Sequence, residues 1–86
     1  MYVYLGADTV VTGDTIIGIF DTDNTTLSKN TRDFLSRAEK EGRVITITND
    51  LPKSFVVCLD RHGRETVYLS QLSAATLRKR AISGSI

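Results

Sequence analysis

Residues 52–80, PKSFVVCLDRHGRETVYLSQLSAATLRKR, decide the fold of this chain. They contain two β-rich runs, Ser54–Leu59 and Glu65–Leu69, separated by the charged, glycine-containing stretch 60–64. Short apolar and β-branched runs on either side of such a stretch are typical of paired strands. The segment therefore predicts a β-hairpin with an open polar tip.

A helix is expected directly after this hairpin. Ser73 is a good N-cap, and Ala74, Leu77 and Ala81 fall on one helical face. Three cations, Arg78-Lys79-Arg80, crowd its last turn, where they also suit the helix dipole. Residues 83–86 are expected to form a flexible tail.

Three β-rich segments, residues 2–5, 9–12 and 16–20, open the chain. The third, IIGIF, is continuously apolar and predicts a central strand buried on both faces. A first helix is expected to begin near Asn30, with Asn30 as N-cap and Asp33 in a capping arrangement, and to end at Gly42.

Residues 44–48, VITIT, alternate and predict one further strand, with a turn at 49–52. The expected order is then β-β-β-α-β-β-β-α. This order predicts an α+β fold with a small, mostly antiparallel sheet and two helices. With 86 residues there is room for one domain, which we place at residues 1–82.

Composition is that of an ordinary globular protein, with a formal net charge of +1 that demands no polyanionic partner. Residues 1–43 hold five basic and seven acidic side chains, whereas residues 44–86 hold six basic and three acidic ones. The basic second half suggests one face that could meet phosphate. Cys58 is the single cysteine and reads as a small buried hydrophobe. Without a leader or membrane span, a cytoplasmic protein is expected.

One segment suggests an enzyme. Residues 16–27, IIGIFDTDNTTL, resemble the first motif of haloacid dehalogenase phosphatases, and 44–49, VITITN, resemble the second. Asp21, Asp23 and Thr48 would then be the nucleophile, the proton donor and the phosphate ligand. The later lysine and acidic pair of that family are missing, and the chain is too short for a doubly wound sheet. We therefore predict a non-enzyme in which these are turn residues.

Metal and cofactor sites are not expected either. His62 and Cys58 have no companions in sequence that would complete the three or four ligands of a metal site. Glycine-rich phosphate loops are also missing. His62 reads as a solvated loop residue.

Several segments spread over the whole chain point to one family. They are MYVYLGAD (1–8), IIGIFD (16–21), TRDFL (31–35) and, more specifically, PKSFVV (52–57), YLSQLS (68–73) and the pair Thr76-Leu77 with RKR (78–80). Their order and spacing resemble the RemB family of small bacterial regulators of extracellular-matrix (biofilm) genes. The resemblance implies a LytTR-like fold, ring-like homo-oligomers and, as in the related RemA proteins, binding of double-stranded DNA.

The chain departs from the DNA-binding relatives at one turn. Adjacent arginines precede the strand equivalent to Ser54–Leu59 in RemA-type proteins, whereas Leu51 and Pro52 stand here, followed by Lys53. Leucine and proline cannot contact phosphate or guanine as arginine does. Two hypotheses follow: a homo-oligomeric DNA-binding regulator, or an interaction module that partners a RemA-type protein with little DNA binding of its own. The nucleic-acid-binding candidates are Lys53, Arg61, Arg64, Arg78, Lys79 and Arg80. Arg43 reads as a surface residue, and the strand residues Tyr2, Tyr4 and Tyr68 read as core or interface residues.

Overall fold

The computed structural model describes residues 2–22 and 28–83. Its strands are β1 (Tyr2–Gly6), β2 (Thr9–Thr12), β3 (Ile16–Asp21), β4 (Val44–Thr46), β5 (Ser54–Leu59) and β6 (Glu65–Ser70). Its helices are the 3-10 turn η1 (Gly13–Thr15), α1 (Lys29–Lys40) and α2 (Ala74–Ser83). The last three residues of the expected tail lie outside the described part.

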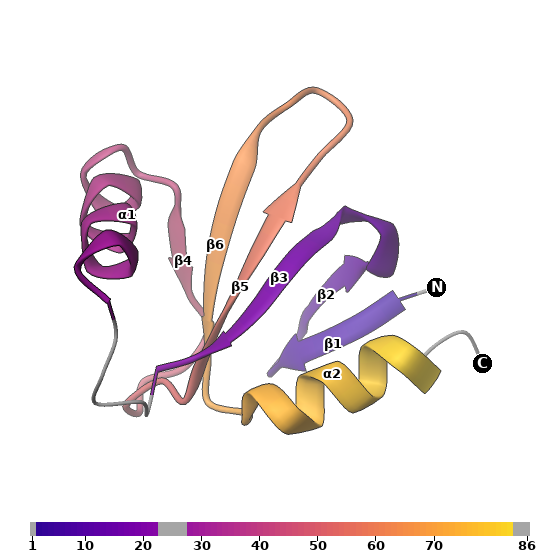
Figure 1. Cartoon of the computed structure of the whole chain (residues 1–86). Helices are drawn as coiled ribbons and strands as arrows, with labels where there is room; N and C mark the ends of the chain where they lie inside the picture. The colour runs from indigo at the N-terminus through magenta and orange to yellow at the C-terminus, as the bar shows by residue number, and fades with distance from the viewer. Residues whose placement is uncertain (1, 23–27, 84–86) are drawn as a thin grey trace.

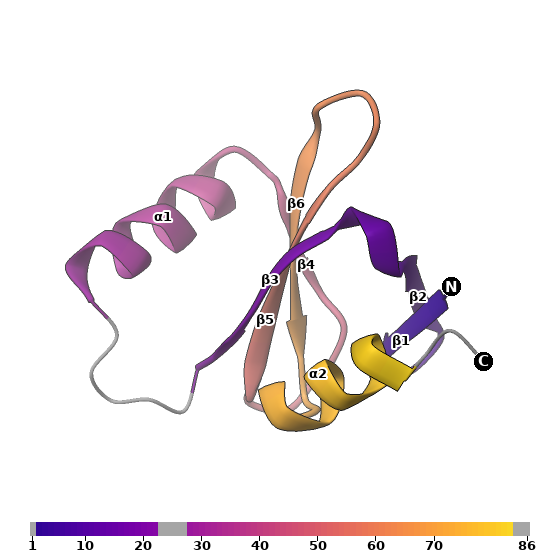
Figure 2. The ribbon, with the colours of Figure 1, turned by 45° about the vertical axis from the view of Figure 1, so that its right-hand side comes forward.

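A four-stranded sheet with the order β3-β5-β6-β4 forms the middle layer. One of its sides faces α1, and the other faces α2 together with a separate β1–β2 hairpin (Figures 1 and 2). Pairing is antiparallel except between β4 and β6, which run parallel. The α+β class, the two helices and the mostly antiparallel pairing are confirmed. The expectation of a single sheet is wrong, because β1 and β2 pair with each other and not with the remaining strands.

The middle of the fold is β5, whose alternating side chains reach both sides of the sheet. On the α2 side the buried cluster consists of Val3, Leu5, Val56, Cys58 and Leu77. On the α1 side it consists of Ala38, Phe55, Val57 and Val67. β5 is therefore an interior strand with buried side chains on both faces. The reading of Cys58 as a buried hydrophobe is confirmed, since it is 6% exposed.

The run at 16–20 forms an edge strand, so the expectation of a central one is wrong. β3 pairs with β5 alone. Ile16 and Ile19 pack against the cluster on the α2 side, whereas Ile17 and Phe20 remain 58% and 45% exposed. Both faces of β3 thus carry apolar side chains, which gives the same continuous pattern as a buried central strand.

The first helix begins earlier than expected. Ser28, not Asn30, is its N-cap: the Ser28 hydroxyl accepts the Thr31 N–H at 3.1 Å, and the Ser28 backbone is extended. The expected end is confirmed, because Gly42 has φ +72 just after the last turn. β4 covers only Val44–Thr46 of the predicted strand 44–48.

Three serines act at the start of the second helix: one caps it, and two link it to the strands. Ser73 caps α2 as predicted, since its hydroxyl accepts the Thr76 N–H at 3.1 Å. The fully buried Ser70 hydroxyl donates to the Leu5 carbonyl and accepts the Leu72 N–H at 3.0 Å. Ser54 donates to the Leu72 carbonyl at 2.8 Å. These bonds hold β1, β5, β6 and the start of α2 together.

Candidate nucleic-acid interface

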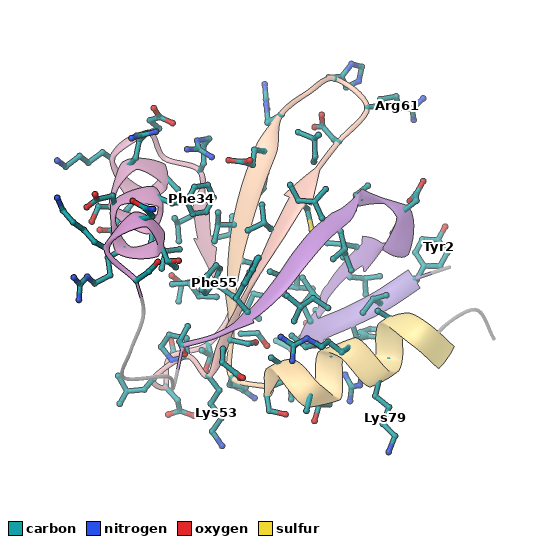
Figure 3. All side chains as sticks on the ribbon, viewed as in Figure 1. Tyr2, Phe34, Lys53, Phe55, Arg61 and Lys79 are labelled. Carbon is teal, nitrogen blue, oxygen red and sulfur yellow. The ribbon has the colours of Figure 1, made fainter. Side chains whose placement is uncertain are left out.

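The six candidate cations fall into two groups at opposite ends of the molecule. Lys53 and Lys79 extend from the end where α2 lies, whereas Arg61 stands at the far tip of the β5–β6 hairpin (Figure 3). β5 separates the two ends with six residues, or about 20 Å at roughly 3.3 Å per residue. Arg64 belongs to the tip and Arg78 and Arg80 to α2. We call the α2 end, with Lys53, Arg78, Lys79 and Arg80, the basic end.

The loop before β5 is held rigidly at this end. The Lys53 N–H donates to the Ser70 carbonyl at 2.8 Å, and the Lys53 carbonyl accepts the Thr22 N–H at 3.0 Å. The Thr22 hydroxyl also donates to the Pro52 carbonyl. The side chain of Lys53 is exposed and that of Leu51 is 89% exposed. The loop therefore presents one cation beside one apolar side chain from a fixed backbone.

The two arginines of α2 have contacts with the strands. The Arg78 guanidinium donates to the Ile19 carbonyl at 2.8 Å, and the Arg80 guanidinium donates to the Tyr4 carbonyl at 3.3 Å. Both side chains remain exposed, and a guanidinium has further donors. Lys79, between them, points away from the ribbon (Figure 3). Sequence reasoning placed the three cations together but missed that two of them bind strand carbonyls.

At the opposite end, Asp60 organises the hairpin tip. Its carboxylate accepts the Arg64 N–H at 2.9 Å and the His62 N–H at 2.8 Å. Both hydrogen bonds stabilise the charged carboxylate and hold the pKa of Asp60 below its ordinary value. The bond from the Arg64 N–H has the larger effect. Gly63 takes φ +78 in this turn. The tip displays Arg61, His62 and Arg64 as exposed side chains on a defined turn.

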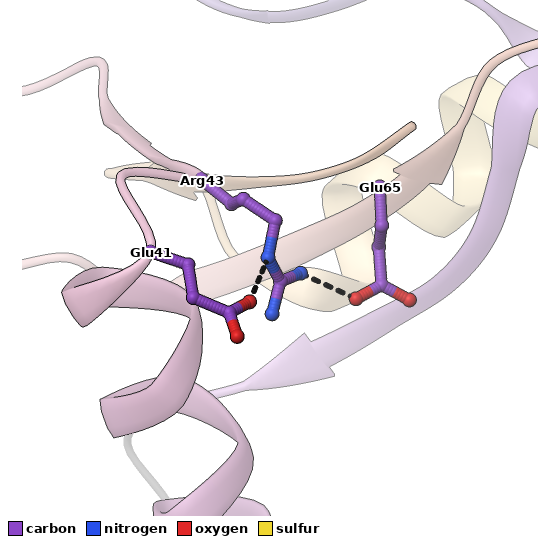
Figure 4. A network of polar contacts seen from close by, with 3 residues as sticks. All are labelled: Glu41, Arg43 and Glu65. Carbon is purple, nitrogen blue, oxygen red and sulfur yellow. Dashed lines mark hydrogen bonds and ion pairs between the residues drawn. The ribbon is translucent and has the colours of Figure 1, made fainter. Parts of the chain in front are cut away.

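Sequence reasoning also missed an ion-pair network. Arg43, read from the sequence as a surface residue, donates to Glu41 at 2.7 Å and to Glu65 (Figure 4). The hydrogen bond that Arg43 donates to Glu41 is the main cause that raises the pKa of Arg43. This network joins the end of α1 to the start of β6, so Arg43 is a connecting residue and not a candidate for nucleic acid.

Two of the three tyrosines are more exposed than core residues would be. Tyr2, Tyr4 and Tyr68 read as core or interface residues. Tyr68 packs against the α2-side cluster, but Tyr2 and Tyr4 are 70% and 57% exposed on the outer face of β1. A core role is therefore wrong for both. The alternation of YVYL in β1 was the available signal, since it places the two rings on one face.

The phosphatase alternative receives no support from the described residues. Asp21 ends the edge strand β3 opposite Ser54, and Thr48 is 7% exposed with its hydroxyl accepting the Asp50 N–H at 3.0 Å. Asp23 lies outside the described residues. The sheet is not the doubly wound parallel sheet of that family, since β4–β6 is the parallel pair among its described strands.

Residues 2–22 and 28–83 contain no group of three or more His, Cys, Asp or Glu side chains that could hold a metal ion. Within the same ranges, neither helix is long and apolar enough to cross a bilayer.

Comparison with known proteins agrees with the family resemblance. A family model described as "RemA-like: Extracellular matrix regulatory protein A-like" matches residues 2–81. The chain is also similar to extracellular matrix regulatory protein B of Bacillus subtilis (strain 168), with 38% identity over 81 residues that cover 94% of this chain and 90% of the relative. Both matches carry the description of a regulator and not of an enzyme. The chain belongs to the RemA-like family of extracellular matrix regulatory proteins.

Proposed function

We propose that this protein is a non-enzymatic, cytoplasmic regulator of extracellular-matrix (biofilm) gene expression that binds double-stranded DNA as a ring-like homo-oligomer with a LytTR-like subunit fold. One observation carries the proposal: the rigid Lys53 loop and the cationic turn of α2 lie at the same end of the subunit (Figure 3). Cations from two fixed elements can meet phosphates without first being ordered.

Oligomerisation explains how a weakly charged subunit would bind DNA. The net charge of +1 provides little attraction for one copy. A ring that repeats the basic end around one surface binds many phosphates at once, so that individually weak contacts add through avidity. Arg61 and Arg64 form a second candidate contact at the hairpin tip. Because this tip lies at the opposite end of the subunit (Figure 3), it is a contact separate from that of the basic end.

A salt titration of DNA binding tests this proposal. Fluorescence anisotropy with a duplex from a matrix-gene promoter should show a steep loss of affinity between about 50 and 200 mM salt, because each phosphate contact adds about 0.9 to the log–log slope. Lys53→Ala and Lys79→Ala should each weaken binding and lower that slope. Lys40→Ala, at the C-terminal end of α1 and away from the basic end, is the matched control and should leave both unchanged. A lack of binding at the lowest salt contradicts DNA binding.

A second function is favoured by the loop itself. Leu51 is 89% exposed beside Pro52, at the turn where the resemblance places arginines in RemA-type proteins, and Arg78 and Arg80 already contact strand carbonyls. The alternative is an oligomeric module that partners a RemA-type regulator and scarcely touches DNA. In that case native mass spectrometry detects a mixed complex, Leu51→Ser weakens it, and salt has little effect on it.

A further inference from the structure

The outer face of the β1–β2 hairpin carries an aromatic patch. Tyr2 and Tyr4 are 70% and 57% exposed, and Val10, directly opposite Tyr4, is 38% exposed. Side chains two residues apart on a strand share a face and are about 7 Å apart. Tyrosine is enriched where proteins meet, because its ring is apolar and its hydroxyl can hydrogen-bond. We call these three residues the tyrosine face.

An apolar groove of about 330 Å³ lies on the other side of the molecule, between α1 and the sheet. Its lining consists of Ile17, Phe20, Asn30, Thr31, Phe34, Phe55, Val57 and Glu65. The Phe20 and Phe55 rings stack with their centroids 4.9 Å apart and form part of the floor. Asn30, Thr31 and Glu65 add polar atoms to a mostly apolar wall. The groove thus offers apolar surface for an aromatic ring and acceptors for a hydroxyl.

The two surfaces also differ in charge. Residues 2–15, which form the β1–β2 hairpin and η1, contain Asp8 and Asp14 and no Lys, Arg or His. α1, which borders the groove, contains four basic side chains, including Lys29 and Arg32, against two acidic ones. An acidic hairpin and a net basic helix attract each other and guide the orientation in which two surfaces meet.

We propose that the tyrosine face of one subunit docks into the groove between α1 and the sheet of a second copy of this chain. The β1–β2 hairpin, which carries the tyrosine face, and α1, which borders the groove, lie on opposite sides of the four-stranded sheet (Figures 1 and 2). The copy that docks keeps its own groove free, and the copy that receives it keeps its own tyrosine face free, so further copies can add at either end. Such a head-to-tail contact produces a ring when the rotation closes. The inference rests on the self-association part of the proposed function and names the surfaces that perform it.

Light scattering of two variants tests the proposal. Tyr2→Ser/Tyr4→Ser removes the tyrosine face, and Ile17→Asp places a charge in the groove at a side chain that is 58% exposed. Each variant should fall from the oligomer to the 9.5 kDa monomer. Arg32→Glu is a second groove-side variant that leaves the sheet untouched and should weaken assembly. Leu51→Ser, exposed outside both surfaces, is the matched control and should remain oligomeric.

Mixing the two monomeric variants is the decisive measurement. Each retains the surface that the other lacks, so an equimolar mixture should form a heterodimer of twice the 9.5 kDa subunit mass and nothing larger. This result also proves that both variants are folded. If the native chain is a monomer at micromolar concentrations, both the proposal and the homo-oligomer are overturned. If the native chain is oligomeric and the variants remain so, or their mixture forms no heterodimer, only the assigned surfaces are overturned.

Discussion

The Arg78 guanidinium donates a hydrogen bond to the Ile19 carbonyl, at 2.8 Å, across the outer edge of β3. The Thr22 N–H donates to the Lys53 carbonyl, just before β5. Because the backbone groups of successive residues in an antiparallel strand point alternately toward and away from the paired strand, those of Ile19 point away from β5. An unpaired strand edge invites pairing with other chains. A helix side chain therefore satisfies one of the exposed acceptors of β3.

Replacing Arg78 should lower stability as well as any affinity for DNA. Arg78→Ala is expected to reduce the free energy of unfolding by about 1 kcal/mol, the net value of one such hydrogen bond. Arg78→Lys keeps the charge without the guanidinium geometry and should lose most of the same stability. Urea denaturation measures both. If Arg78→Ala unfolds at the same urea concentration as the native chain, the edge contact contributes nothing in solution.

The buried Ser70 hydroxyl gives a second prediction. Ser70→Ala leaves the Leu5 carbonyl and the Leu72 N–H without this partner. The expected loss is about 2–3 kcal/mol of unfolding free energy, because buried polar groups without a hydrogen bond are costly. Ser36→Ala, at an exposed position of α1, is the control and should change stability little. Equal stabilities of the two variants would contradict this role for Ser70.

Gly18 allows the Phe20 ring to fold back over β3. A Cβ atom at Gly18 would lie 2.4 Å from that ring, so Gly18→Ala must displace it from its stack with Phe55. We expect a loss of about 1 kcal/mol, the typical value of an aromatic pair. A double-mutant cycle with Phe20→Leu checks the cause: alanine at position 18 should cost less once the ring is gone. Strict additivity would show that Phe20 is not what the alanine displaces.

Acid should weaken the hairpin tip through Asp60. Its folded pKa is lower than the ordinary 3.8 because backbone N–H groups, first that of Arg64, bind the charged form. The unfolded chain therefore binds the Asp60 proton more tightly than the folded chain does. The contribution of the Asp60 carboxylate to the free energy of unfolding is complete above about pH 4 and is lost as the pH falls through the folded pKa. Asp60→Asn should flatten the decrease in melting temperature below that pH. An unchanged acid decrease would show that the charged form of Asp60 gains nothing on folding.

Local rules predict the second half of the fold well. The strands of the β5–β6 hairpin and the Ser73 cap of α2 follow from alternation and N-cap chemistry within a few residues. Which strands become neighbours is decided by contacts distant in sequence. The run Ile16 to Phe20 is apolar because one face of β3 packs against the α2-side cluster and the other lines the groove beside α1, so its pattern could not reveal an edge.

The candidate site shows the same division. Arg78 and Arg80 could be placed in the last turns of a helix, but their acceptors lie 59 and 76 residues away in the chain. The alternation of β1 puts Tyr2 and Tyr4 on one face, but all four of its side chains before Gly6 are apolar or aromatic. Nothing local indicates which pair is buried, since that depends on where α2 packs.

The Ser70–Leu5 bond joins residues 65 positions apart, and this separation has a consequence for synthesis of the protein. β1 is made before the other described strands, yet the β6 serine that binds it is added 65 residues later. At about 5–20 residues per second, the newborn first strand waits several seconds for that partner. During that time its valine and leucine are exposed to other nascent chains and to chaperones. β1 is therefore among the last of the described strands that can reach its native position.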